Sequence, residues 1–312
     1  MIKHEKFMNA NAIILENDTI HLVCLPDFGG KIVSLYHKER DFELLFQNPT
    51  GKFRKAEPGS DYSDFEACGF DDAFPNIDGE IVKVGSNYIT YFDHGEIWTA
   101  KFECQEQQGG ILLSYCSPYL KYRYEKLFTL SDNILRADYT IKNEGNIEFP
   151  CFWTCHCLVK YKSDMRLIFP RGINSVVNVF DSDFLGPSGS VYRFPKDYID
   201  GNKEYNFTRV PEADSATALK YYCCERSQEG RCGYIYPSDG MKAVIRFNPE
   251  ELPYLGFWLT TGGYRGDINC ALEPSNGFFD SITTASKNEK CPILGPGKEM
   301  RFFLELSLDS IR

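Results

Sequence analysis

Residues 268–281 of the chain read INCALEPSNGFFDS. Successive side chains of a β-strand point to opposite faces, so this stretch predicts a strand with one apolar face and one small, polar face. The apolar face would carry Ile268, Cys270 and Leu272, and the other face Asn269, Ala271 and Glu273. Because proline cannot donate to a sheet ladder, we expect the strand to end at Pro274, with Glu273 at the edge of a cleft.

Two interpretations of Glu273 follow from that position. A carboxylate held at the edge of a cleft could act as a catalytic base, because the face that carries it is small and polar and has room beside it for a ligand. It could equally be a structural glutamate paired with a nearby arginine or lysine, because structural ion pairs are common. The residues alone leave both interpretations open.

The rest of the chain has the pattern of an all-β protein. The 312 residues include 24 Phe and 19 Tyr, and short β-branched or aromatic runs are separated by turn residues. Near the start, residues 11–17, 19–26 and 29–37 predict three strands of a meander. We expect one domain spanning residues 1–312, with no helix longer than two turns except around residues 278–286.

A second run, CFWTCHCLV at residues 151–159, repeats the alternation. As a strand it would place Cys155 and Cys157 on an apolar face and Thr154 and His156 on the other. His156 could therefore face a ligand, although a single buried hydrogen bond would also satisfy a structural histidine.

Residues 47–64 are polar and rich in proline and glycine, and they lead into the pair Asp71 and Asp72. A long loop inside a compact domain is usually functional or disordered, and the adjacent aspartates favour a functional loop. His94 and Glu96 follow at a glycine-containing turn between two predicted strands.

Composition excludes several classes of protein. The chain has 44 acidic and 34 basic residues, a formal charge of −10 and no Lys/Arg-rich block, which argues against nucleic acid or an anionic membrane as a partner. No apolar run approaches the ~18 residues of a membrane span, and the N-terminus has no signal-peptide pattern. We therefore expect a cytoplasmic protein.

The 12 cysteines lie singly in strand-like runs, so we expect buried free thiols. Two cysteine clusters, one around His156 and one at residues 223–232, lack the CxxC pairs of a structural zinc site. The sequence therefore predicts no metal site.

Common catalytic motifs are absent from the sequence. There is no GxGxxG after a predicted strand, no phosphate-binding GxxxxGK[ST], no HExxH and no GxSxG. The remaining set of candidate residues is spread along the chain: Asp71, Asp72, His94, Glu96, His156 and Glu273. Two histidines and a carboxylate suit chemistry in which one proton is removed while another is delivered.

Four motifs in order along nearly the whole chain resemble the galactose mutarotase-like aldose 1-epimerases. They are LPDFGGKIVSL at 25–35, CGFDDAFPNI at 68–77 followed by DHGEIW at 93–98, YTIKNEG with PCFWTCHCL at 139–158, and ALEPSNGFFDS with LGPGKEMRFFLELSL at 271–308. The resemblance implies a β-supersandwich of large, twisted antiparallel sheets. It also implies interconversion of the α and β anomers of a free aldose, without a cofactor or a metal.

The resemblance also implies roles for single residues. Glu273 would take the proton from the C1 hydroxyl, and His156 would protonate the ring oxygen, so that the ring opens and closes again on the other face. His94 would polarise the sugar near the ring oxygen. The residues expected to bind hydroxyl groups or stack on the sugar are Asp71, Asp72, Glu96 and Trp98.

The chain departs from that family at several places. Positions at which better-known branches carry an arginine hold Asp78, Gly79 and Trp98. The family's further sugar-binding aspartate would fall within residues 162–217, where the pattern assigns no position. Two alternatives therefore stay open: a non-catalytic carbohydrate-binding protein on the same fold, and a hexose-6-phosphate mutarotase. The sequence does not define the oligomeric state.

Overall fold

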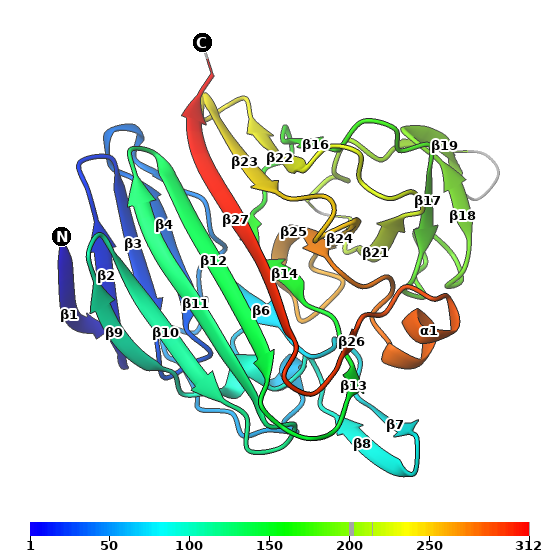
Figure 1. The fold of residues 1–312 in the computed structure, drawn as a ribbon. Coiled ribbons are helices and arrows are strands. Elements are labelled where there is room, and N and C mark those ends of the chain that lie inside the picture. Colours follow the sequence, from blue (N-terminus) through cyan, green and yellow to red (C-terminus); the bar gives the residue numbers. More distant parts are fainter. Residues whose placement is uncertain (200–202, 214, 312) are drawn as a thin grey trace.

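Two large antiparallel sheets, packed face to face, form most of the protein (Figure 1). The structure is a computed structural model and describes residues 1–199, 203–213 and 215–311. The all-β class predicted from the sequence is confirmed.

The larger sheet contains 13 strands. In spatial order, its main path is β1 (Ile2–Phe7), β2 (Ala10–Glu16), β3 (Ile20–Leu25), β4 (Lys31–His37), β6 (Phe70–Ala73), β14 (Thr154–Cys157), β25 (Ile268–Ser275), β24 (Tyr254–Thr261), β21 (Ala218–Cys223), β17 (Ser175–Asn178) and β18 (Val191–Arg193). Two short strands complete it: β5 (Phe42–Glu43), paired with β4, and β15 (Val159–Lys160), paired with β25. Strands far apart in the sequence therefore meet at the centre of this sheet.

The second sheet contains eight strands. In order they are β16 (Arg166–Ile168), β22 (Arg231–Tyr236), β23 (Met241–Phe247), β27 (Glu299–Ser310), β12 (Ile134–Asn143), β11 (Tyr122–Ser131), β10 (Gly110–Cys116) and β9 (Glu103–Gln107). Three further two-stranded sheets pair β7 (Glu80–Val84) with β8 (Asn87–Tyr91), β13 (Phe149–Pro150) with β26 (Ile293–Leu294), and β19 (Lys196–Ile199) with β20 (Lys203–Asn206). The helical elements are α1 (Ile282–Lys287) and the 3₁₀ turns η1 (Lys38–Arg40), η2 (Tyr62–Asp64) and η3 (Ile97–Thr99).

The core lies between the two sheets because their strands alternate with a period of two. Along β11 and β12 every second side chain is buried, and the residues between them are partly exposed. The larger sheet presents Cys155, Cys157, Cys270 and Leu272 to the same core. Its strands β6, β14, β25, β24 and β21 therefore have a second face, directed away from the core, that is free to carry polar groups.

The structure confirms several sequence predictions about single elements. The opening meander appears as β2, β3 and β4, and the short helix appears as α1. The alternation predicted for residues 268–273 is also present, but Ile268 is 40% exposed instead of packed in the core, because it lies at the end of β25, next to the turn from β24.

The predicted end of the strand at Pro274 is wrong by one residue. β25 continues to Ser275, and Pro274 lies opposite Leu255 of β24. The backbone N–H of Leu272 points to the same edge of β25 as position 274 does. It donates to Tyr234 Oη at 2.5 Å and not to a neighbouring strand. On that side the neighbouring β14 pairs with β25 at Ser275, so the missing N–H of proline is tolerated.

All 12 cysteines are free thiols, and eight of them are buried, mostly on core faces of strands. This confirms the expectation of unpaired thiols, although Cys104 and Cys116 are exposed. No helix in the described part of the chain has the length and apolar character that a membrane crossing requires.

Trp153 is the largest of the fully buried side chains. Its Nε1 donates to Tyr124 Oη at 2.9 Å, and its ring packs against Phe302, with 4.7 Å between the ring centroids. We expect Trp153→Ala to lower the free energy of unfolding by about 3 to 5 kcal/mol, because it removes a large core side chain and leaves a cavity.

Urea unfolding followed by fluorescence measures that loss. The matched control is Tyr88→Ala, which truncates an aromatic residue that is 72% exposed and should change the free energy of unfolding by no more than about 0.5 kcal/mol. Equal, small effects of both substitutions would contradict this description of the core.

Candidate functional site

A cavity of about 170 Å³ lies on the face of the larger sheet that is directed away from the core. Four central strands form its floor, and each contributes side chains of one parity. These side chains are His156 from β14, Asn269 and Glu273 from β25, Trp258 and Thr260 from β24, and Lys220 from β21. The alternation of the strands thus places polar groups in the cavity and apolar groups in the core.

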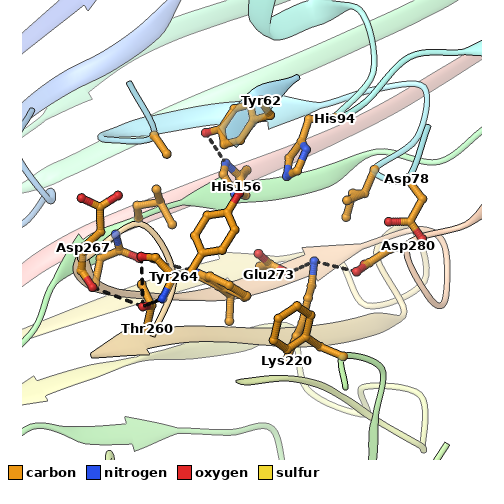
Figure 2. Close-up of a pocket in the computed structure, with 16 residues that line it drawn as sticks. Tyr62, Asp78, His94, His156, Lys220, Thr260, Tyr264, Asp267, Glu273 and Asp280 are labelled. Atoms are coloured by element: carbon orange, nitrogen blue, oxygen red, sulfur yellow. Dashed lines mark hydrogen bonds and ion pairs between the residues drawn. The ribbon is translucent and has the colours of Figure 1, made fainter. Parts of the chain in front are cut away.

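Loops complete the walls of the cavity. Tyr62 comes from the long loop that precedes β6, and Asp78 and His94 come from the loops after β6 and β8. The turn between β24 and β25 contributes Tyr264, and the segment before α1 contributes Asp280. In Figure 2 the two histidines and Tyr62 lie on one side of the cavity, and Glu273, Lys220 and Asp280 lie on the other.

His156 is held by a carboxylate from the neighbouring strand. Asp71 of β6 is its register partner, and Asp71 Oδ1 lies 2.7 Å from His156 Nδ1. Burial alone would raise the pKa of Asp71, but the Lys31 ammonium, 3.1 Å away, and His156 together lower it below its usual range. The ionised Asp71 therefore accepts the Nδ1 proton of His156 and leaves the Nε2 atom for a ligand.

His94 lies on the same side of the cavity in a constrained conformation. Its ring stacks on Tyr62, with 4.0 Å between the centroids, and its Nδ1 lies 2.8 Å from Asp93 Oδ1. His94 has a φ of 54°, and the next residue, Gly95, has a φ of 76° with no room for a Cβ, which would lie 2.1 Å from Phe74 O. Burial, opposed by Asp93, lowers the pKa of His94, so this ring is neutral at neutral pH.

Glu273 is fully buried, yet neither of its carboxylate oxygens has a hydrogen-bond partner among the described residues. Lys220 Nζ lies 3.3 Å from Glu273 Oε2, close enough for an ion pair but without the geometry of a hydrogen bond. Buried polar groups are almost always hydrogen-bonded, so an exception in a cavity points to a ligand that supplies the partner.

Asp78 lies at the rim of the cavity, next to Asp280. Its surroundings raise the pKa of Asp78 to about 6, mainly through burial and then through repulsion by the Asp280 carboxylate. Asp78 therefore changes its charge near the acidic end of the physiological range.

The structure brings three of the sequence-predicted residues to one cavity and places four elsewhere. Glu273, His156 and His94 all line the cavity. Asp71 lies behind His156, where it can orient the imidazole. Outside the cavity lining are Asp72, Glu96 and Trp98.

Each of those three side chains forms an ion pair or hydrogen bonds with other residues of the protein. Asp72 has the opposite parity to Asp71, so it faces the core, where its Oδ2 pairs with Lys126 Nζ at 2.7 Å. Glu96 accepts hydrogen bonds from the hydroxyl groups of Tyr115, Ser117 and Tyr122. Trp98 Nε1 donates to the carbonyl of Asp93, and its ring packs against Tyr62 from behind. These placements correct the expected contacts with a sugar.

Sequence reasoning missed Lys220, Asp280 and Tyr62. One signal was present for Lys220: within ALKYYC it is the only charged side chain of a strand that is otherwise apolar or aromatic. Asp280 and Tyr62 lie in loops, and their approach to the cavity depends on strand order, which the sequence pattern does not define. Of the poorly patterned residues 162–217, Phe180 reaches the cavity lining.

The described residues offer no ready metal site. Within residues 1–199, 203–213 and 215–311, no three His, Cys, Asp or Glu side chains are grouped as ligands of one metal ion. The cysteines beside His156 point into the core, away from the imidazole. What the cavity does present is two imidazoles, several carboxylates, one ammonium and flanking aromatic rings, a set that suits a small polyhydroxylated ligand.

Solved structures with the same fold cover nearly the whole chain. A protein from Synechocystis sp. PCC 6803 superposes with a TM-score of 0.72 at 18% identity and covers 99% of this chain and 100% of its own. A galactose mutarotase-like protein from Lactobacillus casei ATCC 334 has a TM-score of 0.71 at 16% identity, covering 96% and 100%. A galactose mutarotase related enzyme from Lactobacillus acidophilus has a TM-score of 0.67 at 14% identity, covering 96% and 99%.

These similarities show that the chain has the galactose mutarotase-like fold, as the sequence motifs predicted. By sequence, residues 3–83 match a family described as a domain of unknown function (DUF5107). No curated protein sequence matches the chain significantly.

The raised pKa of Asp78 predicts a pH dependence of stability. The pKa of an aspartate is usually about 4, whereas that of Asp78 in the folded protein is about 6. Between these two pH values, Asp78 binds more protons in the folded state than in the unfolded state. This group therefore stabilises the fold at low pH, and that contribution is lost as the pH rises through 6. Because asparagine does not ionise, Asp78→Asn should not lose this stability as the pH rises. We therefore expect the free energy of unfolding of the variant to increase relative to that of the wild type from pH 4 to pH 6.5.

Urea unfolding at several pH values checks this expectation. Asp18→Asn, the same substitution in the turn between β2 and β3, serves as the control and should run parallel to the wild type. If Asp78→Asn also ran parallel to the wild type, the assignment of Asp78 as a group titrating near pH 6 would be wrong.

Proposed function

We propose that the protein is an aldose 1-epimerase, a mutarotase that interconverts the α and β anomers of a free, uncharged aldose. The main support is the fully buried carboxylate of Glu273, which has no hydrogen-bond partner among the described residues and lies in the same cavity as the imidazole of His156 that Asp71 holds. Opening a sugar ring needs one group to remove a proton and another to deliver one, and these two side chains provide them.

The reaction would begin with Glu273. Its carboxylate accepts the proton of the C1 hydroxyl while the protonated His156 donates from Nε2 to the ring oxygen. The bond between C1 and the ring oxygen breaks, which gives the open-chain aldehyde, and the C1–C2 bond rotates. On closure His156 takes back the proton of the former ring oxygen, and Glu273 returns its proton to the C1 oxygen. Each side chain ends in its starting form.

The surrounding groups support those two roles. Asp71, held by Lys31, contacts His156 Nδ1 and fixes the orientation of the imidazole. The neutral His94, on the same side of the cavity, donates its one ring proton from Nδ1 to the Asp93 carboxylate, so its Nε2 is free to accept a hydrogen bond from a sugar hydroxyl. Trp258 and Phe180 line the cavity and offer apolar surface to a sugar ring.

The two histidines and Glu273 also separate this proposal from the alternative of a non-catalytic sugar-binding protein. Binding of a sugar without catalysis needs only hydrogen bonds, and ordinary polar side chains can supply those. A buried carboxylate without a hydrogen-bond partner and a carboxylate-oriented histidine instead suit proton transfer.

We expect Glu273→Gln and His156→Ala each to lower the rate of catalysed mutarotation by about 10²- to 10⁴-fold, because each removes one proton-transfer group. Polarimetry of a freshly dissolved anomer measures the rate. Glu43→Gln is the matched control, since Glu43 is a partly buried glutamate of β5 that accepts a hydrogen bond from Ser34 Oγ, outside the cavity. If both variants were as active as the wild type and the control, the mechanism would fail.

The charge of the cavity favours an uncharged sugar over a hexose 6-phosphate. Four lining residues are acidic, namely Asp78, Asp267, Glu273 and Asp280, and Lys220 is the one lysine or arginine among the described lining residues. That lysine is already shared by two carboxylates. Phosphate recognition usually requires clustered arginine or lysine side chains.

We therefore expect the protein to accelerate anomer exchange of an unphosphorylated hexose and to leave exchange of the corresponding 6-phosphate near its uncatalysed rate. Exchange spectroscopy by NMR on both sugars at equal concentration measures the difference. Faster exchange of the phosphorylated sugar would favour the hexose-6-phosphate mutarotase instead.

A further inference from the structure

Lys220 is the charged neighbour of Glu273 that the proposed mechanism has not yet used. It lies on β21, its side chain faces the cavity, and it is 7% exposed. Its Nζ lies 3.3 Å from Glu273 Oε2 and 3.0 Å from Asp280 Oδ2, so one ammonium is shared by two carboxylates (Figure 2).

Asp280, the second carboxylate that contacts this ammonium, is itself held in place by hydrogen bonds. Asp280 Oδ1 accepts a hydrogen bond from Tyr222 Oη at 2.8 Å, and the carbonyl of Asp280 accepts one from Asp78 N–H at 2.9 Å. Asp280 is therefore tied to β21 and to the loop after β6. Lys220 is held between a fixed carboxylate and Glu273.

The backbone opposite Glu273 is shaped to receive its carboxylate. The register partner of Glu273 on β24 is Gly256, and a Cβ at that position would lie 3.1 Å from Glu273 Oε2 and 3.2 Å from the ring of Tyr222. The absence of a side chain at position 256 lets the carboxylate lie against β24, next to the ammonium.

The charge state of Lys220 excludes another role for it. Burial alone would lower the pKa of Lys220, but the carboxylates of Asp280 and Glu273 overcome that effect and raise it above its usual value. The side chain is therefore a permanent cation and cannot act as an amine nucleophile. An open-chain aldehyde formed beside it would not be trapped as an imine.

We propose that Lys220 is a positioning residue that holds Glu273 as an oriented carboxylate anion, the form able to accept a proton, while Asp280 and Tyr222 fix the ammonium. The role of Glu273 as the base rests on the function proposed above. Without Lys220, the burial of a carboxylate that has no hydrogen-bond partner would favour the protonated form.

Several other titratable groups surround Glu273 and contribute to the electrostatic environment of its carboxylate. They are His156 from β14, His94 and Asp78 from the loops, Tyr222 and Asp280 beside Lys220, Asp267 at the turn before β25, and Cys155 on the core face of β14. In the described part of the chain, Lys220 is the one cationic side chain within ion-pair distance of Glu273.

Substitutions of Lys220 and of Asp280 should shift the pH profile of kcat/KM in opposite directions. In Lys220→Met the acid limb of kcat/KM should move up by about 1 to 3 pH units, because an opposite charge close to the base is removed. In Asp280→Asn the limb should move down, because the ammonium then serves Glu273 alone. Lys220→Arg should restore the limb to near its wild-type position.

The matched control is Lys160→Met. Lys160 Nζ lies 3.3 Å from Asp239 Oδ2, the same separation as in the Lys220 pair, but outside the cavity. Its acid limb should coincide with that of the wild type. Lys220→Met and Asp280→Asn variants that lose rate without moving the acid limb would show a merely structural role and overturn the proposal.

A second readout does not depend on activity. In protein labelled with ¹³C at the glutamate carboxyl carbon, the Glu273 signal is assigned by its absence in Glu273→Gln, and its titration is followed by NMR. It should titrate at higher pH in Lys220→Met and at lower pH in Asp280→Asn than in the wild type. Identical titrations in all three proteins would overturn the role of Lys220. If the two variants show these shifts but the wild type catalyses no anomer exchange, the proposed function would be wrong and the role of Lys220 would stand.

Discussion

The burial of a carboxylate that has no hydrogen-bond partner is the constraint on which this site depends. Moving an ionised carboxylate out of water costs several kcal/mol unless a nearby opposite charge offsets it. For Glu273 that charge is the ammonium of Lys220, and the space for the carboxylate is supplied by Gly256 on the adjacent strand. Lys220 in turn needs Asp280, and Asp280 is tied to Tyr222 and to the loop that carries Asp78. One buried negative charge thus links three strands and two loops.

The larger sheet serves two purposes because its two faces differ. Asp71 and Asp72 are adjacent on β6 and both are buried, yet they point to opposite sides of the sheet. Asp72 pairs with Lys126 in the core between the sheets, whereas Asp71 holds His156 at the cavity. A shift of β6 by one residue would turn each aspartate to the other face of the sheet, so the register of one short strand determines which aspartate supports the proposed chemistry.

How far the sequence predicted the site depended on the range of the interactions involved. The period of two within residues 151–159 and 268–273 correctly directed His156 and Glu273 away from the core, because that signal is local. Asp72, Glu96 and Trp98 were assigned to the sugar from their neighbourhood in a motif, and the structure shows that each instead contacts other parts of the protein. Lys220 and Asp280 are 53 and 7 residues from Glu273 in the sequence, and their meeting requires the order β21, β24, β25, which no local pattern encodes.

We propose that this cavity exchanges anomers and does more than bind a sugar. Two-dimensional exchange NMR on the wild-type protein with a panel of uncharged aldoses tests it most directly, with calorimetry on the same samples to record binding. We expect that, for at least one sugar that binds, the exchange peaks between the α and β anomers grow in proportion to protein concentration. Sugars that bind with no acceleration of exchange for any member of the panel would contradict it.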